Sequence, residues 1–97
     1  MRGRVSINQG AREALVRAKA SLLSSGVIKV EGDFQTKDVV SIIDSEGREL
    51  ARGLINFGKR ETEELIQHAS QNKSDRLQVL VTRNNIVLRN DNNEDSN

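Results

Sequence analysis

The sequence predicts a mainly β domain with two short helices, in which five or six short strands form a twisted sheet or a partly closed barrel. Three observations favour this class. Short stretches of alternating or β-branched residues recur along the chain, only two stretches show helical spacing of apolar residues, and turn residues separate them. With 97 residues the chain can bury a single core, and with only two aromatic residues that core must consist mainly of Val, Ile, Leu and Ala.

The first third of the chain predicts a strand, a helix and a loop. Residues 4–8 alternate polar and apolar side chains, as a half-buried strand does. From residue 9 to about residue 22, apolar residues recur at spacings of three and four, which predicts an amphipathic helix with Asn8 as its N-cap. Residues 24–26, Ser-Ser-Gly, are expected to form the loop that follows.

Three strands are expected next. Residues 27–31 alternate, residues 39–44 are a β-branched run, and residues 49–57 form its hairpin partner across a turn at residues 45–47. Gly53 interrupts the last of these strands and indicates a bulge or a close backbone approach.

The remainder predicts a second helix and a final hairpin. Residues 59–69 have an apolar face and acidic residues near their start, where the helix dipole favours negative charge. After a polar link at residues 71–75, residues 78–82 and 86–88 are expected to pair with each other around two asparagines, since Asn tolerates the positive φ of tight turns.

Charge is distributed unevenly, although the formal net charge is only +1. Residues 1–30 hold six basic residues and one acidic residue, whereas residues 90–97 hold three acidic residues and no base. The basic surplus is a modest footprint for a polyanion, and scattered solubilising charge is the alternative interpretation. We expect one domain at residues 1–89, followed by a disordered acidic tail at residues 90–97.

The inventory of reactive side chains argues against catalysis by this chain and against a metal or cofactor. It contains no cysteine, a single histidine, His68, and no glycine-rich phosphate-binding motif. Glu31 and Asp33 could share a site as paired carboxylates. Glu31-Gly32-Asp33 is more typical of a tight turn whose carboxylates accept hydrogen bonds from backbone N–H groups. 

Two further observations bear on location. No apolar run approaches the roughly 20 residues that span a bilayer, so no membrane partner is expected. The absence of cysteine fits a reducing, cytoplasmic location.

Several motifs in the middle of the chain carry a family resemblance. Residues 26–34, Gly-Val-Ile-Lys-Val-Glu-Gly-Asp-Phe, are followed by Lys-Asp-Val-Val at residues 37–40, Gly47 and Ala-Arg-Gly at residues 51–53. In this order they resemble a PUA domain, a small RNA-binding module found in pseudouridine synthases and archaeosine transglycosylases. The resemblance implies a PUA-like pseudo-barrel and structured, tRNA-like RNA as a partner.

A narrower resemblance covers nearly the whole predicted domain. Ser-Leu-Leu at residues 21–23, Val-Glu-Gly-Asp-Phe at 30–34, Ala-Arg-Gly-Leu-Ile-Asn-Phe at 51–57 and Arg-Asn-Asn-Ile-Val-Leu at 83–88 are similar to the C-terminal PUA domain of bacterial glutamate 5-kinase. That enzyme phosphorylates glutamate at the start of proline biosynthesis. The resemblance implies a non-catalytic regulatory or assembly role, with an amino-acid kinase domain of the same parent protein as partner.

The sequence departs from that pattern at two positions. Ala20 and Ser24 stand where the kinase domains usually carry a lysine before Ser-Leu-Leu and a proline after it. This chain therefore lacks that lysine, and with it any ligand contact that the lysine makes in those domains.

The family resemblance also implies which residues face RNA. In PUA domains this surface comprises the first helix, the loop after it and the last strand, on which the basic surplus is also expected to lie. Gly26 would let the backbone approach a phosphate closely, and basic side chains would contact other phosphates. Without an aromatic residue in this patch, we expect recognition of duplex or folded RNA. The implied contact residues are Arg12, Val16, Arg17, Lys19, Ser24, Ser25, Gly26 and Arg89, with Gly32, Asp33 and Gly53 as structural turn residues.

Overall fold

The computed structural model describes residues 2–70 and 78–89. These residues form one sheet with strand order β2-β6-β5-β4-β1-β3, in which β1 and β4 are parallel and every other pair is antiparallel. The predicted mainly β class with two helices is confirmed. The elements in chain order are β1 (Gly3–Ile7), α1 (Gln9–Ala18), β2 (Leu22–Leu23), the 3-10 turn η1 (Ser24–Gly26), β3 (Val27–Gly32), β4 (Val39–Ile43), β5 (Glu49–Ile55), α2 (Lys59–Ser70) and β6 (Val79–Leu88).

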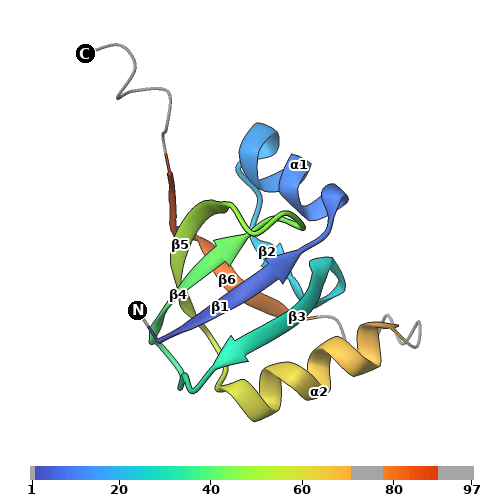
Figure 1. Cartoon of the computed structure of the whole chain (residues 1–97), viewed down its shortest axis with the longest axis vertical. Coiled ribbons are helices and arrows are strands. Elements are labelled where there is room, and N and C mark those ends of the chain that lie inside the picture. Colours follow the sequence, from blue (N-terminus) through green and yellow to red (C-terminus); the bar gives the residue numbers. More distant parts are fainter. Residues whose placement is uncertain (1, 71–77, 90–97) are drawn as a thin grey trace.

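The core lies inside the curl of this sheet. In Figure 1, β4, β1 and β3 cross the front of the molecule and β2 and β6 lie behind them, with α1 at one end and α2 along β3. Leu15 of α1 and Phe34, which follows β3, are almost fully buried. Burying such apolar side chains stabilises the fold by about 1.5–3 kcal/mol each. The strands contribute the other members of the cluster: Val5, Ile7, Leu22, Val27, Val30, Val40, Ile42, Ala51, Ile55, Leu80 and Val81.

The first helix ends earlier than the sequence predicts. Asn8 caps its start, accepting a hydrogen bond from the N–H of Ala11 at 2.8 Å, as expected. At its end, Lys19 adopts the left-handed conformation with φ 52°, and its N–H bonds to the carbonyl of Ala14. The helix therefore stops at Ala18, and the predicted last turn instead provides β2, which pairs with β6.

The predicted hairpin at the end of the domain is wrong. Residues 79–88 form a single strand, and both of its halves pair with β5. Gly53 pairs with Ile86 while Ile55 pairs with Val81, so β6 carries extra residues in a bulge opposite β5. A Cβ on Gly53 would lie 2.6 Å from Cγ1 of Val81 and 2.9 Å from the carbonyl oxygen of Asn85. Only a glycine allows β6 to approach β5 this closely, so the asparagines mark a bulge and not a reversal.

The carboxylates that accept hydrogen bonds from backbone N–H groups in turns are not those of Glu31 and Asp33, which the sequence predicts. Gly32 does turn the chain, with φ 99°. The Glu31 carboxylate, however, lies within 4.0 Å of two basic side chains, and none of the described residues hydrogen-bonds the carboxylate of Asp33. Asp38 instead accepts from a backbone N–H at 2.8 Å, and Asp44 accepts from two at 2.9 and 3.0 Å. The predicted link at 71–75 and tail at 90–97 fall outside the described residues.

Candidate nucleic-acid interface

An open groove separates the end of α1 from the bulged part of β6. Its volume is about 370 Å³. Leu15, one of the core residues, lines it together with Ile86 and Leu88, so part of its surface is apolar. Lys19 and Arg83 bring two positive charges to the same groove. Ala20, Asn84 and Val87 complete the lining.

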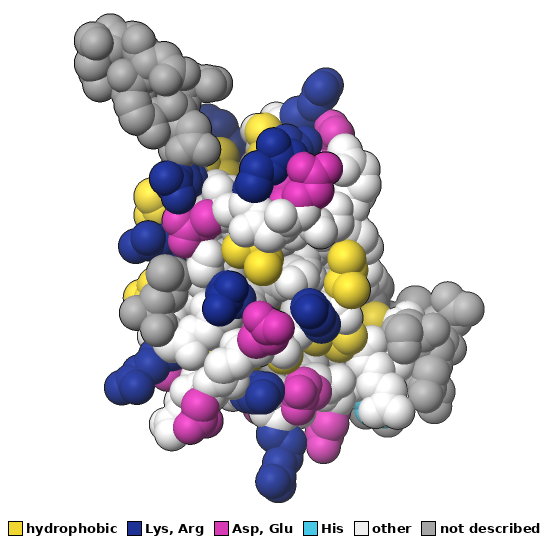
Figure 2. Space-filling model, in the orientation of Figure 1, with side chains coloured by type: hydrophobic (Ala, Val, Ile, Leu, Met, Phe, Trp, Pro, Cys, Tyr) yellow, Lys and Arg dark blue, Asp and Glu magenta, His cyan; other side chains and the backbone are white. Residues whose placement is uncertain are grey.

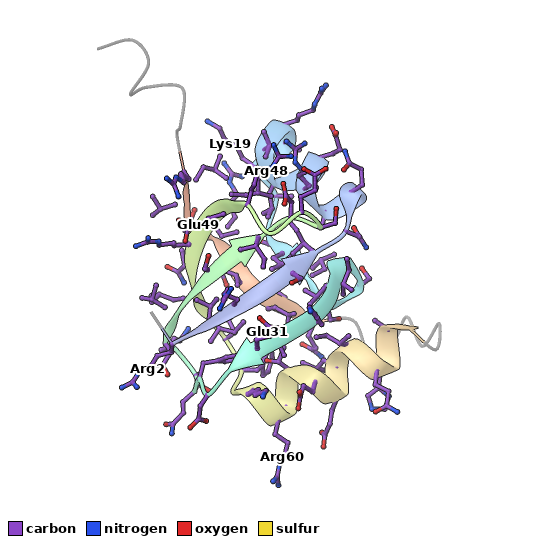
Figure 3. The ribbon with its side chains drawn as sticks, viewed as in Figure 1. Arg2, Lys19, Glu31, Arg48, Glu49 and Arg60 are labelled. Atoms are coloured by element: carbon purple, nitrogen blue, oxygen red, sulfur yellow. The ribbon has the colours of Figure 1, made fainter. Side chains whose placement is uncertain are left out.

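Lys19 is held at the groove by an unusual backbone. Its φ of 52° and ψ of 43° place it in the left-handed region at the helix C-cap, where glycine is common. For a residue with a Cβ this conformation costs roughly 1–2 kcal/mol. The side chain is exposed at the α1 end of the molecule (Figure 3) and forms no ion pair within residues 2–70 and 78–89. The left-handed conformation thus leaves a solvent-exposed positive charge at the edge of the groove.

Arg83 is the site residue that sequence reasoning missed. Its backbone N–H donates to Oγ of Ser21 at 2.8 Å, which ties the bulge of β6 to the segment after α1. Its side chain is exposed and makes no ion pair with the described part of the chain. The sequence did hold a signal, because Arg83 is the only charged residue between positions 78 and 88.

The other predicted α1 residues do not line this groove. Arg12 lies 4.0 Å from the Glu13 carboxylate, and Arg17 forms an ion pair with the same carboxylate at 2.8 Å. Glu13 therefore offsets part of the positive charge of the helix. Val16 is 44% exposed on α1.

The loop residues predicted to contact RNA divide into two kinds. Ser24 is almost fully buried, and its Oγ accepts from the N–H of Gln78 at 3.2 Å. Gly26 is buried too, and a Cβ there would lie 2.6 Å from the Cβ of Ala11. The structure explains both residues by packing. Ser25 is exposed beside them.

Arg89 lies beyond the groove, in a second open groove of about 450 Å³ on the β5–β6 side. Its Nη1 lies 3.3 Å from one oxygen of Glu49, and Nε of Arg52 donates to the other oxygen at 2.9 Å. These arginines and a hydrogen bond from Ser41 lower the pKa of Glu49 below its usual value, against the effect of burial. Val87 lines both grooves.

The basic surplus of the first third does not gather on one surface, contrary to the sequence-based expectation. Arg2 and Arg4 line a third open groove with Glu31, on the sheet. Lys29 reaches the same glutamate, with Nζ 3.6 Å from its carboxylate. Half of the six bases therefore lie on β1 and β3 or next to them, and only Arg12, Arg17 and Lys19 belong to α1 and its cap.

No helix within the described ranges is long and apolar enough to cross a membrane.

Comparison with known proteins finds relatives in sequence and in fold. A glutamate 5-kinase of Nitrosospira multiformis is 40% identical over 93 residues, covering 91% of this chain and 25% of the relative. That of Bordetella petrii is 46% identical over 70 residues, covering 72% of this chain and 18% of the relative. The chain thus spans a quarter or less of the length of these relatives. A crystal structure of a PUA domain from Aeropyrum pernix, in a tartrate complex, matches with a TM-score of 0.74 and 26% identity, covering 86% of this chain and 42% of that one.

The family assignment rests on the length of chain that a single family model matches. The model of the PUA domain matches residues 3–76, from the start of β1 to beyond α2. Six strands in a curled sheet and two helices agree with it. The chain belongs to the PUA domain family.

Proposed function

We propose that this PUA domain binds structured RNA at the groove between α1 and β6. The observation that carries the proposal is that two exposed bases, Lys19 and Arg83, line one groove from two separate elements and form no ion pair with any described residue. The chain has a charged lysine at position 19, although a glycine would adopt this left-handed backbone conformation at a lower energetic cost. Phosphate groups are the ligand that such a pair suits, and neutralising them releases counterions.

The composition of the groove favours one mode of recognition. Val87, which is 73% exposed, and the half-buried Ile86 offer apolar surface against which ribose rings can pack. No aromatic side chain lines the groove, so bases have no ring on which to stack. Folded or duplex RNA, read through its backbone and shape, is therefore the expected ligand class.

The experiment that tests this function is an NMR titration of the labelled chain with folded tRNA, at low and at physiological salt. Amide shifts at residues 15–20 and 83–88, with a dissociation constant of about 1–100 μM that weakens steeply with salt, support the proposal. Shifts confined to α2, or no shifts at low salt, reject it.

The similarity to glutamate 5-kinases supports a second role. We infer that the chain is the non-catalytic PUA domain of a cytoplasmic glutamate 5-kinase, in which a separate amino-acid kinase domain performs the phosphoryl transfer. Identity of 40% across 91% of this chain supports that parentage. The domain would then serve regulation or assembly of the enzyme.

A comparison of the parent enzyme with and without this domain tests the second role. We expect glutamate phosphorylation to persist without the domain, with a changed oligomeric state or changed regulation. An inactive but folded kinase fragment would show that the domain takes part in catalysis, and unchanged assembly and regulation would reject the role.

A further inference from the structure

A row of paired residues crosses the outer face of the sheet. Glu31 of β3 pairs with Arg4 of β1, which pairs with Ser41 of β4; Ser41 pairs with Arg52 of β5, and Arg52 with Val87 of β6. Directly paired residues share a face of a sheet, and their chain neighbours point to the other face. Those neighbours point into the core, which includes Val5, Val30, Val40, Ile42 and Ala51. Gly53 lies on the same side, directly against β6.

Neither helix covers this face. In Figure 1, α1 and α2 lie at the two ends of the molecule, and β4, β1 and β3 are unobstructed at the front. Figure 2 shows Lys and Arg side chains on this face, with Asp and Glu side chains among them, as well as at the α1 end. Among described residues near the row, the bases outnumber the acids: Arg2, Arg4, Lys29, Arg52 and Arg89 stand against Glu31 and Glu49.

Ser41 is a short, buried side chain that lies between two exposed arginines on the neighbouring strands. It is 4% exposed, and its Oγ donates to the carboxylate of Glu49 at 2.7 Å. Arg4 and Arg52 flank it on the neighbouring strands, with side chains 65% and 57% exposed. Since neighbouring strands lie about 4.8 Å apart, the two arginine Cα atoms are about 10 Å apart. Two long side chains at that separation can converge on one phosphate group.

Glu49 fixes the direction of one of these arginines. Its carboxylate accepts from Nε of Arg52 at 2.9 Å and lies 3.3 Å from Nη1 of Arg89, while its own side chain is only 14% exposed. A guanidinium has five N–H donors, so Arg52 keeps others for a ligand. A side chain that is already held loses less freedom when it binds.

This face is continuous with the groove between α1 and β6. Val87 ends the cross-strand row, is 73% exposed, and lines both that groove and the groove of Arg52 and Arg89. Basic residues therefore lie on both sides of this exposed apolar side chain: Lys19 and Arg83 in the α1–β6 groove, and Arg52 and Arg89 on the outer face of the sheet.

We propose that bound RNA extends past Val87 onto the outer face of the sheet, where a backbone phosphate binds between Arg4 and Arg52 above Ser41. This inference rests on the proposed function of the α1–β6 groove and assigns that RNA a second anchoring point. The RNA must then be long enough to reach from β6 across β5 and β4 to β1, three strands beyond the groove, and a short RNA occupies the groove alone.

The test compares two RNAs and three variants. One RNA is a short hairpin sized for the groove, and the other is the same hairpin with its duplex extended by one helical turn. The sheet variant is Arg4→Gln with Arg52→Gln, the groove variant is Lys19→Gln with Arg83→Gln, and the control is Lys59→Gln with Arg60→Gln on α2. Because Arg52 also contacts Glu49, Arg4→Gln alone is measured as a second sheet variant that keeps this contact.

In the sheet variants we expect affinity for the extended RNA to fall about fivefold to tenfold, with a shallower salt slope, and affinity for the short RNA to stay unchanged. Equal affinities of the wild-type chain for the two RNAs, or no loss in either sheet variant, would overturn the second anchoring point. If the groove variant binds both RNAs as tightly as the wild-type chain does, the proposed groove is rejected, and this outcome is distinct from failure of the sheet face.

Discussion

Gly26 lies so close to Ala11 that a Cβ on the glycine would be 2.6 Å from the Cβ of the alanine. Real Cβ atoms do not approach this closely, so η1 and α1 can pack in this way only with glycine at position 26. The N–H of Asn8 donates to the Gly26 carbonyl at 2.9 Å and ties the same two segments together. The glycine that the sequence suggested for phosphate contact therefore has a packing role.

This contact predicts a compensating pair of substitutions. Gly26→Ala should lower the free energy of unfolding by about 1–3 kcal/mol, because the added methyl group forces η1 away from α1. Ala11→Gly should cost about 1 kcal/mol by itself through lost helix propensity. Combined, the two should cost less than their sum, as urea denaturation of all four proteins would show. Strict additivity would contradict the contact.

Replacing Lys19 by glycine should raise stability and weaken RNA binding. Lys19→Gly relieves the left-handed strain, so it should raise the free energy of unfolding by up to about 1 kcal/mol despite the flexibility that glycine adds to the unfolded chain. It should also weaken RNA binding, because one phosphate contact is lost. Lys19→Ala is the matched control, which loses the charge but keeps the strain. Thermal unfolding and RNA titration of both variants check this, and a glycine variant less stable than the alanine variant would contradict it.

Protonation of Asp44 in acid should lower the stability of the folded domain. Burial raises the pKa of its carboxyl, but hydrogen bonds from the N–H groups of Arg48 and Glu46, and the Arg48 guanidinium, together lower the pKa below its usual value. Since the folded pKa is below the unfolded one, the stabilisation is complete above the unfolded value, about 3.9, and is lost as pH falls through the folded value.

The measurement is the free energy of unfolding of the wild-type chain and Asp44→Asn between pH 7 and pH 2. The variant should be less stable by about 1–3 kcal/mol at pH 7, and the gap should close below about pH 4. Glu46→Gln, an exposed neighbour, serves as the control and should change little. A gap that persists at pH 2 would show that the carboxylate charge is not the cause.

Removal of residues 90–97 should strengthen RNA binding. This segment carries three acidic residues and no base, and it follows directly after Arg89 at the end of β6. Its negative charge opposes the approach of RNA to the basic grooves, an effect that salt screens. Replacing Asp91, Glu94 and Asp95 by their amides should reproduce the gain at low salt. If truncation helps but the amide variant does not, chain length and not charge is responsible.

The fold class and most elements could be predicted from residue spacing, and the two errors have physical causes. Apolar spacing continues past Ala18 to Leu22, so nothing in the pattern ends the helix where the left-handed Lys19 does. Asn84 and Asn85 resemble a turn, but neither has a positive φ. Their bulge depends on Gly53, which is distant in sequence and lies directly against β6.

The candidate site was predictable only in part. Lys19 follows from its position at the end of the first helix. Arg83 was overlooked because the predicted hairpin hid its position beside Lys19. A count of charges could not show that Arg4 lies on a different face from Arg17, since that depends on the register between β1, β3 and β4.

The most direct test of the central claim is the salt dependence of tRNA binding by three proteins: the wild-type chain, Lys19→Gln with Arg83→Gln, and the control Lys59→Gln with Arg60→Gln. Each pair removes two positive charges, but only the first pair lines the groove. We expect the groove variant to bind several-fold more weakly, with a slope of log K against log salt that is shallower by about 1.4–1.8 for two lost phosphate contacts, and the control to match the wild type. Equal weakening in both variants, or none in the groove variant, would contradict the assigned interface.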